Sequence, residues 1–214
     1  MHVVSRALSD VGNLRTRAMY VAVREATITA AKRDDFRIVH LSIQRTHLHL
    51  IVEAQNRTAL AKGMQGFLIA AARYVNRAVL ERTGVRRRGS VFGDRYHART
   101  LATPRQVRNC IAYVLNNWRH HDEHRTGPAR TWKLDPFSSA ILFGGWKGLV
   151  DSPTMYRRRS TYDPLVVWLP KTWLLRVSWQ RHGAIDEYEV PGFPRPRRRQ
   201  ARAPQQPVDP ALAE

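Results

Sequence analysis

Hydrophobic and polar positions alternate in two neighbouring segments near the start of the chain. Residues 36–43 (FRIVHLSI) and 47–54 (HLHLIVEA) each have the pattern of a β-strand, and the three residues between them fit a hairpin turn. A shorter strand is predicted over residues 2–8 (HVVSRAL). The start of the chain therefore favours an antiparallel sheet.

Helical periodicity marks three longer segments, residues 15–32, 57–82 and 104–121. In the second segment, apolar residues recur at three- and four-residue steps, as they do on the buried side of a helix. This stripe consists of Leu60, Met64, Phe67, Ala71, Val75 and Val79. The third segment opens with Thr103-Pro104, which places threonine at the N-cap and proline at the first helical position.

Residues 91–101 (VFGDRYHARTL) are predicted to form a fourth strand. The first six elements then follow the order β-α-β-β-α-β, which is typical of the ferredoxin-like arrangement. We therefore expect an α+β fold with an antiparallel sheet and helices on one face. The helix over residues 104–121 follows that unit as a seventh element.

The composition changes after residue 121. Gly, Pro and Trp alternate with short apolar pieces over residues 122–193, and the piece at 173–183 (WLLRVSWQRHG) fits a short helix packed on the preceding domain. Residues 194–214 are rich in Pro and Arg and are predicted to be disordered. We therefore divide the chain into a domain over 1–121, a Trp- and Pro-rich extension over 122–193, and a basic tail.

The chain carries 36 Lys and Arg against 17 Asp and Glu, a formal net charge of +19. This excess favours a polyanionic partner, and nucleic acid above all. A cationic membrane-surface or ribosome-associated protein is less favoured, because the arginines are spread along the chain. With Cys110 as its single cysteine, the chain forms no internal disulfide. It has neither a membrane-spanning run of about 18 apolar residues nor a signal peptide, so we expect a soluble, cytoplasmic protein.

Two histidines lie one residue apart in the second hairpin strand. Because side chains alternate along a strand, His47 and His49 share one face and Leu48 and Leu50 share the other. The leucines are expected to pack on the helices, which leaves the imidazoles on the open side of the sheet. Their Cα atoms should lie about 6.6–7 Å apart, so both rings can reach one metal ion. A lone His-x-His triplet is a weak signal, because histidines in strands more often have no ligand.

The helix over residues 104–121 carries a tyrosine away from its apolar stripe. That stripe contains Val107, Ile111, Val114 and Trp118. Tyr113 lies on the other side of the helix among amides, with Asn117 as its neighbour one turn later. Residues 95–121 contain no Asp or Glu. An acid-free, amide-rich face with a tyrosine suits contact with a phosphate better than core packing.

Three segments together resemble the HUH single-tyrosine transposases. They are His47-Leu48-His49, the RRGSVFGDRYHA segment (87–98) and the AYVLNN segment (112–117). The resemblance covers roughly residues 1–121 and is closest to the branch associated with REP elements. That branch usually has proline where this chain has Trp118.

The resemblance implies a role for each matching residue. His47 and His49 would bind a divalent metal, Asn117 would be its third protein ligand, and Tyr113 would be the nucleophile. The activity implied is cleavage and rejoining of single-stranded, hairpin-forming DNA through a 5′-phosphotyrosine intermediate. The ligand types favour Mn²⁺ and availability favours Mg²⁺. Relatives act as monomers or homodimers, and the sequence does not decide between the two.

Several basic and aromatic residues near these motifs are candidates for contact with DNA. Arginines suit the phosphate backbone, and an aromatic or imidazole ring suits stacking on the bases of a single strand. The candidates are Arg86, Arg87, Arg88, Arg95, Tyr96, His97, Arg99, Arg105 and Arg108.

Two other functions stay open at this point. A domesticated relative would bind structured single-stranded DNA or RNA without cutting it. A cyclic phosphodiesterase would need paired His-x-Thr/Ser motifs, and the chain has one His-x-His motif without a second copy. A transposase with a carboxylate triad is disfavoured by the scarcity of acids around the candidate residues.

Overall fold

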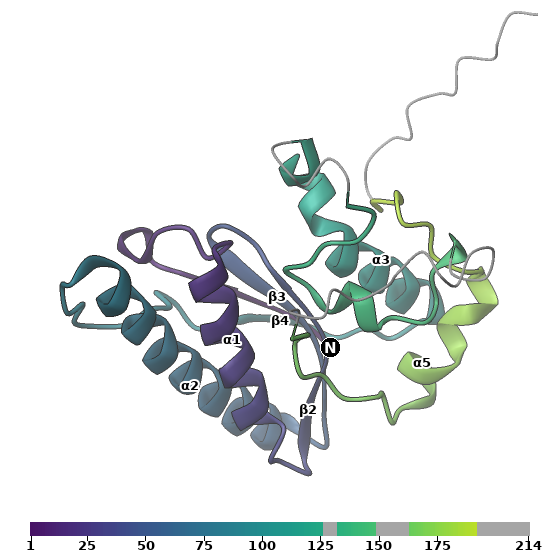
Figure 1. Ribbon diagram of the computed structural model, residues 1–214. Helices are drawn as coiled ribbons and strands as arrows, with labels where there is room; N and C mark the ends of the chain where they lie inside the picture. The colour runs from purple at the N-terminus through teal and green to yellow at the C-terminus, as the bar shows by residue number, and fades with distance from the viewer. Residues whose placement is uncertain (126–131, 149–162, 192–214) are drawn as a thin grey trace, which may run out of the picture.

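The computed structural model describes residues 1–125, 132–148 and 163–191 (Figure 1). The basic tail predicted over 194–214 lies outside the described residues. The strands and the main helices are β1 (His2–Arg6), α1 (Arg17–Ala30), β2 (Phe36–Ile43), β3 (His47–Ala54), α2 (Arg57–Thr83), β4 (His97–Arg99), α3 (Pro104–His120) and α5 (Trp173–Arg176).

The four strands form one antiparallel sheet in the order β2-β3-β1-β4. Both strands of the predicted hairpin have the predicted bounds, and their registers pair Leu41 with Leu50 and Ile43 with Leu48. This topology confirms the α+β, ferredoxin-like expectation. The two central strands are β3, which carries the histidine pair, and β1.

Helices α1 and α2 cover one face of this sheet. Leu48 and Leu50 are fully buried there, as the alternation of β3 predicts. Helix α2 comes close to β2 at Gly63, where an added Cβ would lie 2.2 Å from Cγ of Phe36. A glycine at this position therefore sets the distance between helix and sheet.

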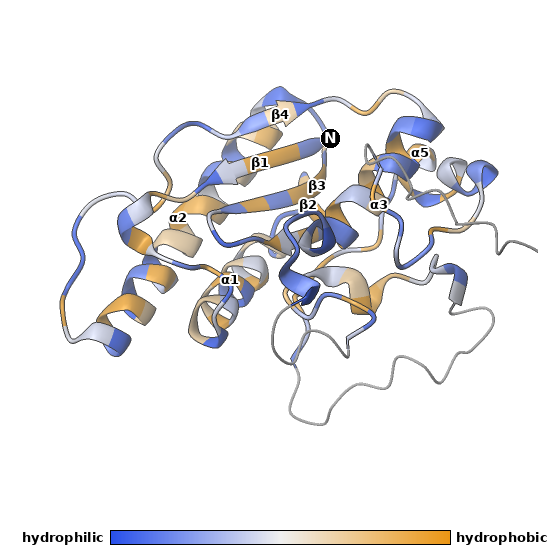
Figure 2. Ribbon diagram, turned by 90° about the horizontal axis from the view of Figure 1, so that it is seen from above, coloured by the Kyte–Doolittle hydropathy of each residue, from blue (hydrophilic) through white to orange (hydrophobic). Residues whose placement is uncertain are grey.

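Helix α3 covers the opposite face, so the expectation of an open face beside the imidazoles is wrong. Figure 1 shows α3 and α5 on the far side of the sheet from α1 and α2, and in Figure 2 the two pairs of helices again lie apart. The cause is that α3 is apolar on more than one side, since Ala112 and Leu115 are buried as fully as the Val107 stripe. The helix therefore packs against the sheet and the C-terminal extension together.

The fourth strand is shorter than predicted, and the expectation of one strand over residues 91–101 is wrong. Only His97–Arg99 pair as β4, and Phe92 forms a separate bridge to Ala7. Between them Gly93 packs so closely on Leu8 that an added Cβ would lie 2.7 Å from its Cδ2. The chain turns at this contact, and the ladder is interrupted.

Part of the extension packs around α3 and forms a second hydrophobic core, apart from the one between the sheet and helices α1 and α2. Trp146, Trp179 and Ile185 are buried there, next to residues of α3. The predicted helix over residues 173–183 appears as α5, followed by a 3₁₀ turn over Ser178–His182 that packs on α3. Within the described part of the chain, no helix is long and apolar enough to cross a membrane.

Candidate active site

Strand β3 places the histidine pair on the face that α3 covers. His49 lies opposite Val4 of β1 and Ser42 of β2, and His47 lies opposite Arg6. The centroids of the two imidazoles are 4.7 Å apart, and the ring planes meet at 77°. His49 is 4% exposed, whereas His47 is half-buried at the end of the strand. The two rings thus line one small region between the sheet and α3.

Each imidazole has a partner at its Nδ1 atom. Nδ1 of His47 lies 3.1 Å from Oγ1 of Thr46, and Nδ1 of His49 lies 3.1 Å from Nε2 of His2. When both Nδ1 atoms donate, each Nε2 atom keeps a lone pair, which is the form that binds a metal. Nε2 of His49 is buried and has no hydrogen-bond partner within the described residues.

Both imidazoles are held in the neutral form. Burial lowers the pKa of His47 to about 4, with a smaller effect from the neighbouring His121. Burial and the adjacent His47 lower the pKa of His49 to about 2. At neutral pH, each ring therefore keeps one nitrogen lone pair that a metal could use.

Helix α3 brings the tyrosine and the asparagine to the same region. The ring centroid of Tyr113 lies 5.3 Å from that of His49 in an edge-on contact. Two turns later, the His121 ring centroid lies 5.5 Å from that of His47. Asn117 lies one helical turn from each of these two contacts, on the same side of the helix. It is fully buried, and neither polar atom of its amide has a described hydrogen-bond partner.

These donor atoms fit a divalent ion. No three His, Cys, Asp or Glu side chains are grouped as a metal site in the part of the chain that the structure describes. A metal here would therefore depend on the amide oxygen of Asn117 in addition to the two imidazoles. The unpartnered atoms of His49 and Asn117 are buried polar groups that a bound ion would satisfy. Three protein ligands would also leave coordination positions open for phosphate oxygens.

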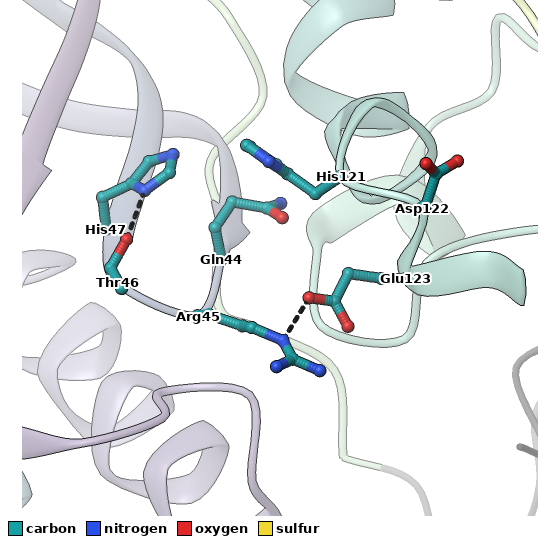
Figure 3. Close-up of a pocket in the computed structure, with 7 residues that line it drawn as sticks. All are labelled: Gln44, Arg45, Thr46, His47, His121, Asp122 and Glu123. Carbon is teal, nitrogen blue, oxygen red and sulfur yellow. Dashed lines mark hydrogen bonds and ion pairs between the residues drawn. The ribbon is translucent and has the colours of Figure 1, made fainter. Parts of the chain in front are cut away.

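A cavity of about 470 Å³ opens beside His47. Figure 3 shows His47 and His121 on its two sides, with Arg45 reaching across to Glu123. The ion pair between Arg45 and Glu123 spans 2.5 Å and joins the β2–β3 turn to the end of α3. The cavity gives His47 access to solvent. It is lined by Gln44, Arg45, Thr46, His47, His121, Asp122 and Glu123.

Sequence reasoning missed His2 and His121. The His2 ring contacts both His49 and Tyr113, with centroid distances of 5.4 and 6.0 Å. The sequence did contain a signal for His121: it follows Asn117 by four residues, which places the two side chains on the same side of a helix. No comparable signal existed for His2, because its position depends on the register between β1 and β3.

Two of the candidate DNA contacts are engaged within the protein. The Arg87 guanidinium forms an ion pair of 2.8 Å with Asp10. Arg108 forms a bidentate pair with Glu189, and it also donates to the carbonyl groups of Gly183 and Ala184. These contacts fasten a loop and the C-terminal extension, respectively.

The other candidates differ in the face they occupy. His97 and Arg99 lie opposite Val4 and His2, so they share the face of the histidine pair, and both are exposed. Tyr96 packs partly into the core beneath α1 and α2. The remaining arginines are exposed and form no ion pair within the described residues: Arg86, Arg88, Arg95 and Arg105.

Comparison with known proteins gives a family match and a structural similarity. A family model described as "Transposase IS200 like" matches residues 1–117, more than half of the chain. A solved structure described as "Structure of the REP associates tyrosine transposase bound to a REP hairpin" is 15% identical, with a TM-score of 0.48. The similarity covers 77% of this chain and 91% of that chain. No curated protein matches significantly.

Proposed function

Because this chain belongs to the IS200-like transposase family, we propose that it cuts and rejoins single-stranded DNA with Tyr113 as the nucleophile. The observation that carries the proposal is the contact between the rings of Tyr113 and His49, at 5.3 Å in a single chain. Membership of a transposase family makes DNA the expected substrate, and the net charge of +19 suits a polyanion.

The proposed step is a direct displacement at phosphorus. The phenolic oxygen of Tyr113 forms a bond to the scissile phosphate as the bond from phosphorus to the 3′ oxygen breaks. The phenol loses its proton, and the departing 3′ oxygen gains one. The products are a 5′-phosphotyrosine and a free 3′-hydroxyl. The covalent intermediate keeps the phosphodiester energy, so another 3′-hydroxyl can rejoin the strand.

The chain's own residues supply orientation for this step. Thr46 and His2 set the directions of the two imidazoles, while α3 fixes the phenol above them. A divalent ion, Mg²⁺ or Mn²⁺, held by His47, His49 and Asn117, would polarise the phosphate and offset its developing charge.

The single-stranded DNA is proposed to enter along the face of the sheet that carries His97 and Arg99, since both residues are exposed on the face of the histidine pair. The other exposed arginines, Arg86, Arg88, Arg95 and Arg105, would add contacts to the phosphate backbone. One chain holds the tyrosine and both histidines, which supports action as a monomer, although a homodimer stays compatible. Hairpin-forming DNA remains the proposed substrate class, and the proposed location is the cytoplasm.

The decisive experiment follows covalent adduct formation on a panel of hairpin-bearing single strands with Mn²⁺. Tyr113→Phe should abolish the adduct, because phenylalanine has no oxygen to attack phosphorus. Tyr74→Phe is the control, since Tyr74 packs against the core on the other face of the sheet. Unchanged nicking by Tyr113→Phe would contradict the mechanism. Tight binding without any adduct from the unmodified chain would instead support a non-cleaving binder.

A further inference from the structure

We propose that His2 is a positioning residue that orients His49. It accepts a hydrogen bond from Nδ1 of His49 and thereby turns the Nε2 lone pair of His49 toward Asn117 and Tyr113. This inference deepens the proposed function and rests on it.

The geometry of the two rings is that of an in-plane hydrogen bond. Nε2 of His2 lies 3.1 Å from Nδ1 of His49, and the ring planes differ by 12°. The distance between the ring centroids is 5.4 Å, which exceeds the nitrogen–nitrogen distance by about one ring width. The rings therefore lie end to end, as an N–H···N bond requires, and not face to face.

The backbone fixes this contact. His2 lies opposite Ile51 of β3 on one side and Arg99 of β4 on the other. His49 lies opposite Val4, so His2 and His49 are diagonal neighbours on one face. Because β1 is hydrogen-bonded on both sides, the backbone of His2 is held beside that of His49.

The bond decides which nitrogen of His49 faces the site. Nε2 of His49 is buried without a described partner, so its direction is not set by any bond of its own. A proton on Nδ1 that is donated to His2 leaves a lone pair on Nε2. Thr46 does the same for His47. The two imidazoles are therefore oriented by different residues, His47 by Thr46 and His49 by His2.

His2 also touches the nucleophile. Its ring meets the Tyr113 ring edge-on at a centroid distance of 6.0 Å. Two substitutions separate this packing contact from the hydrogen bond. His2→Phe keeps a ring against Tyr113 but has no acceptor, whereas His2→Gln keeps an acceptor but has no ring.

The test measures Mn²⁺ affinity of the full chain by calorimetry, with thermal unfolding as a check on folding. Loss of an orienting partner typically weakens metal binding by about 10–100-fold. We expect a loss of that size for His2→Phe, and a change of only a few-fold for His2→Gln. Adduct formation by His2→Phe should recover at high Mn²⁺ concentration. Wild-type Mn²⁺ affinity in a folded His2→Phe variant would overturn the proposal.

A second readout needs no metal. Nitrogen NMR of the imidazoles in the metal-free wild-type chain should show His49 protonated at Nδ1. Protonation at Nε2 would overturn the proposal even if His2→Phe does not fold. A chain that binds Mn²⁺ in this His2-dependent way but forms no DNA adduct would contradict the proposed nuclease alone. A chain that forms the adduct with unchanged metal affinity in His2→Phe would contradict the role of His2 alone.

Discussion

Arg99 and Arg108 are equivalent by sequence pattern, since both lie in the acid-free stretch over residues 95–121. The structure gives them different roles. Arg99 is exposed beside His2 at the edge of the sheet. Arg108 is paired with Glu189, and this hydrogen-bonded pair raises the pKa of its guanidinium. At the scale of single residues, the partner and not the residue type decides which arginine is available to DNA.

A salt titration should separate these two arginines. Arg99→Ala should weaken binding to single-stranded DNA and reduce the slope of log affinity against log salt by about 0.7, the value for one lost phosphate contact. Arg108→Ala should leave the slope unchanged and lower the free energy of unfolding, because Glu189 loses its partner. Fluorescence anisotropy over a range of NaCl concentrations gives the slopes. A larger slope change for Arg108→Ala would contradict this assignment.

At the scale of elements, the distance between α2 and the sheet depends on one glycine. Gly63 faces the Phe36 ring, whereas Gly66, one turn further along, is exposed with nothing within 4 Å of an added Cβ. Both glycines lower helix propensity equally. Of the two, only Gly63 permits the close approach to the buried Phe36 ring.

Alanine at each position should therefore have opposite effects. Gly66→Ala should raise the free energy of unfolding by about 0.5–1 kcal/mol through helix propensity. Gly63→Ala should lower it by about 1–3 kcal/mol, because a buried aromatic ring must move. Urea unfolding of the two variants measures both changes. Equal stabilisation by the two substitutions would show that α2 does not depend on this contact.

At the scale of the whole molecule, two cores lie on opposite faces of one sheet, and a buried ion pair links the extension to the segment before α1. Arg15 precedes α1, and Asp135 belongs to the extension. Their side chains are 5% and 0% exposed, and a guanidinium nitrogen of Arg15 lies 2.8 Å from a carboxylate oxygen of Asp135. Arg15 also donates to the carbonyl group of Ile43, at the end of β2. The pair therefore fastens the extension near the turn that leads into His47.

Breaking this pair should destabilise the whole chain. Asp135→Ala leaves the Arg15 guanidinium buried without its counter-charge, which should lower the free energy of unfolding by about 3–5 kcal/mol. Adding Arg15→Met in the same chain should recover part of the loss. Glu81→Ala breaks the exposed pair with Arg77 and is the control, with little expected change. Urea unfolding measures all three, and equal effects of Asp135→Ala and Glu81→Ala would contradict the proposed link.

The sequence by itself determined the local elements of this protein and the residues that carry its proposed chemistry. Alternation gave the bounds of β2 and β3 and put both histidines on one face, because that period is a local property of the chain. Thr103 gave the start of α3, where its side chain accepts from the backbone N–H of Gln106. The proposed roles of His47, His49, Tyr113 and Asn117 came from the resemblance of their motifs to one family.

The tertiary structure alone decided how these pieces meet. The register between β1 and β3 puts His2 against His49, and docking of α3 closes the face that the sequence left open. The Gly93–Leu8 contact cuts short the fourth strand. Each of these outcomes depends on pairing between residues far apart in the chain, where many registers satisfy the same local pattern. Local periodicity therefore fixes which face a side chain occupies, and only long-range packing fixes its partner.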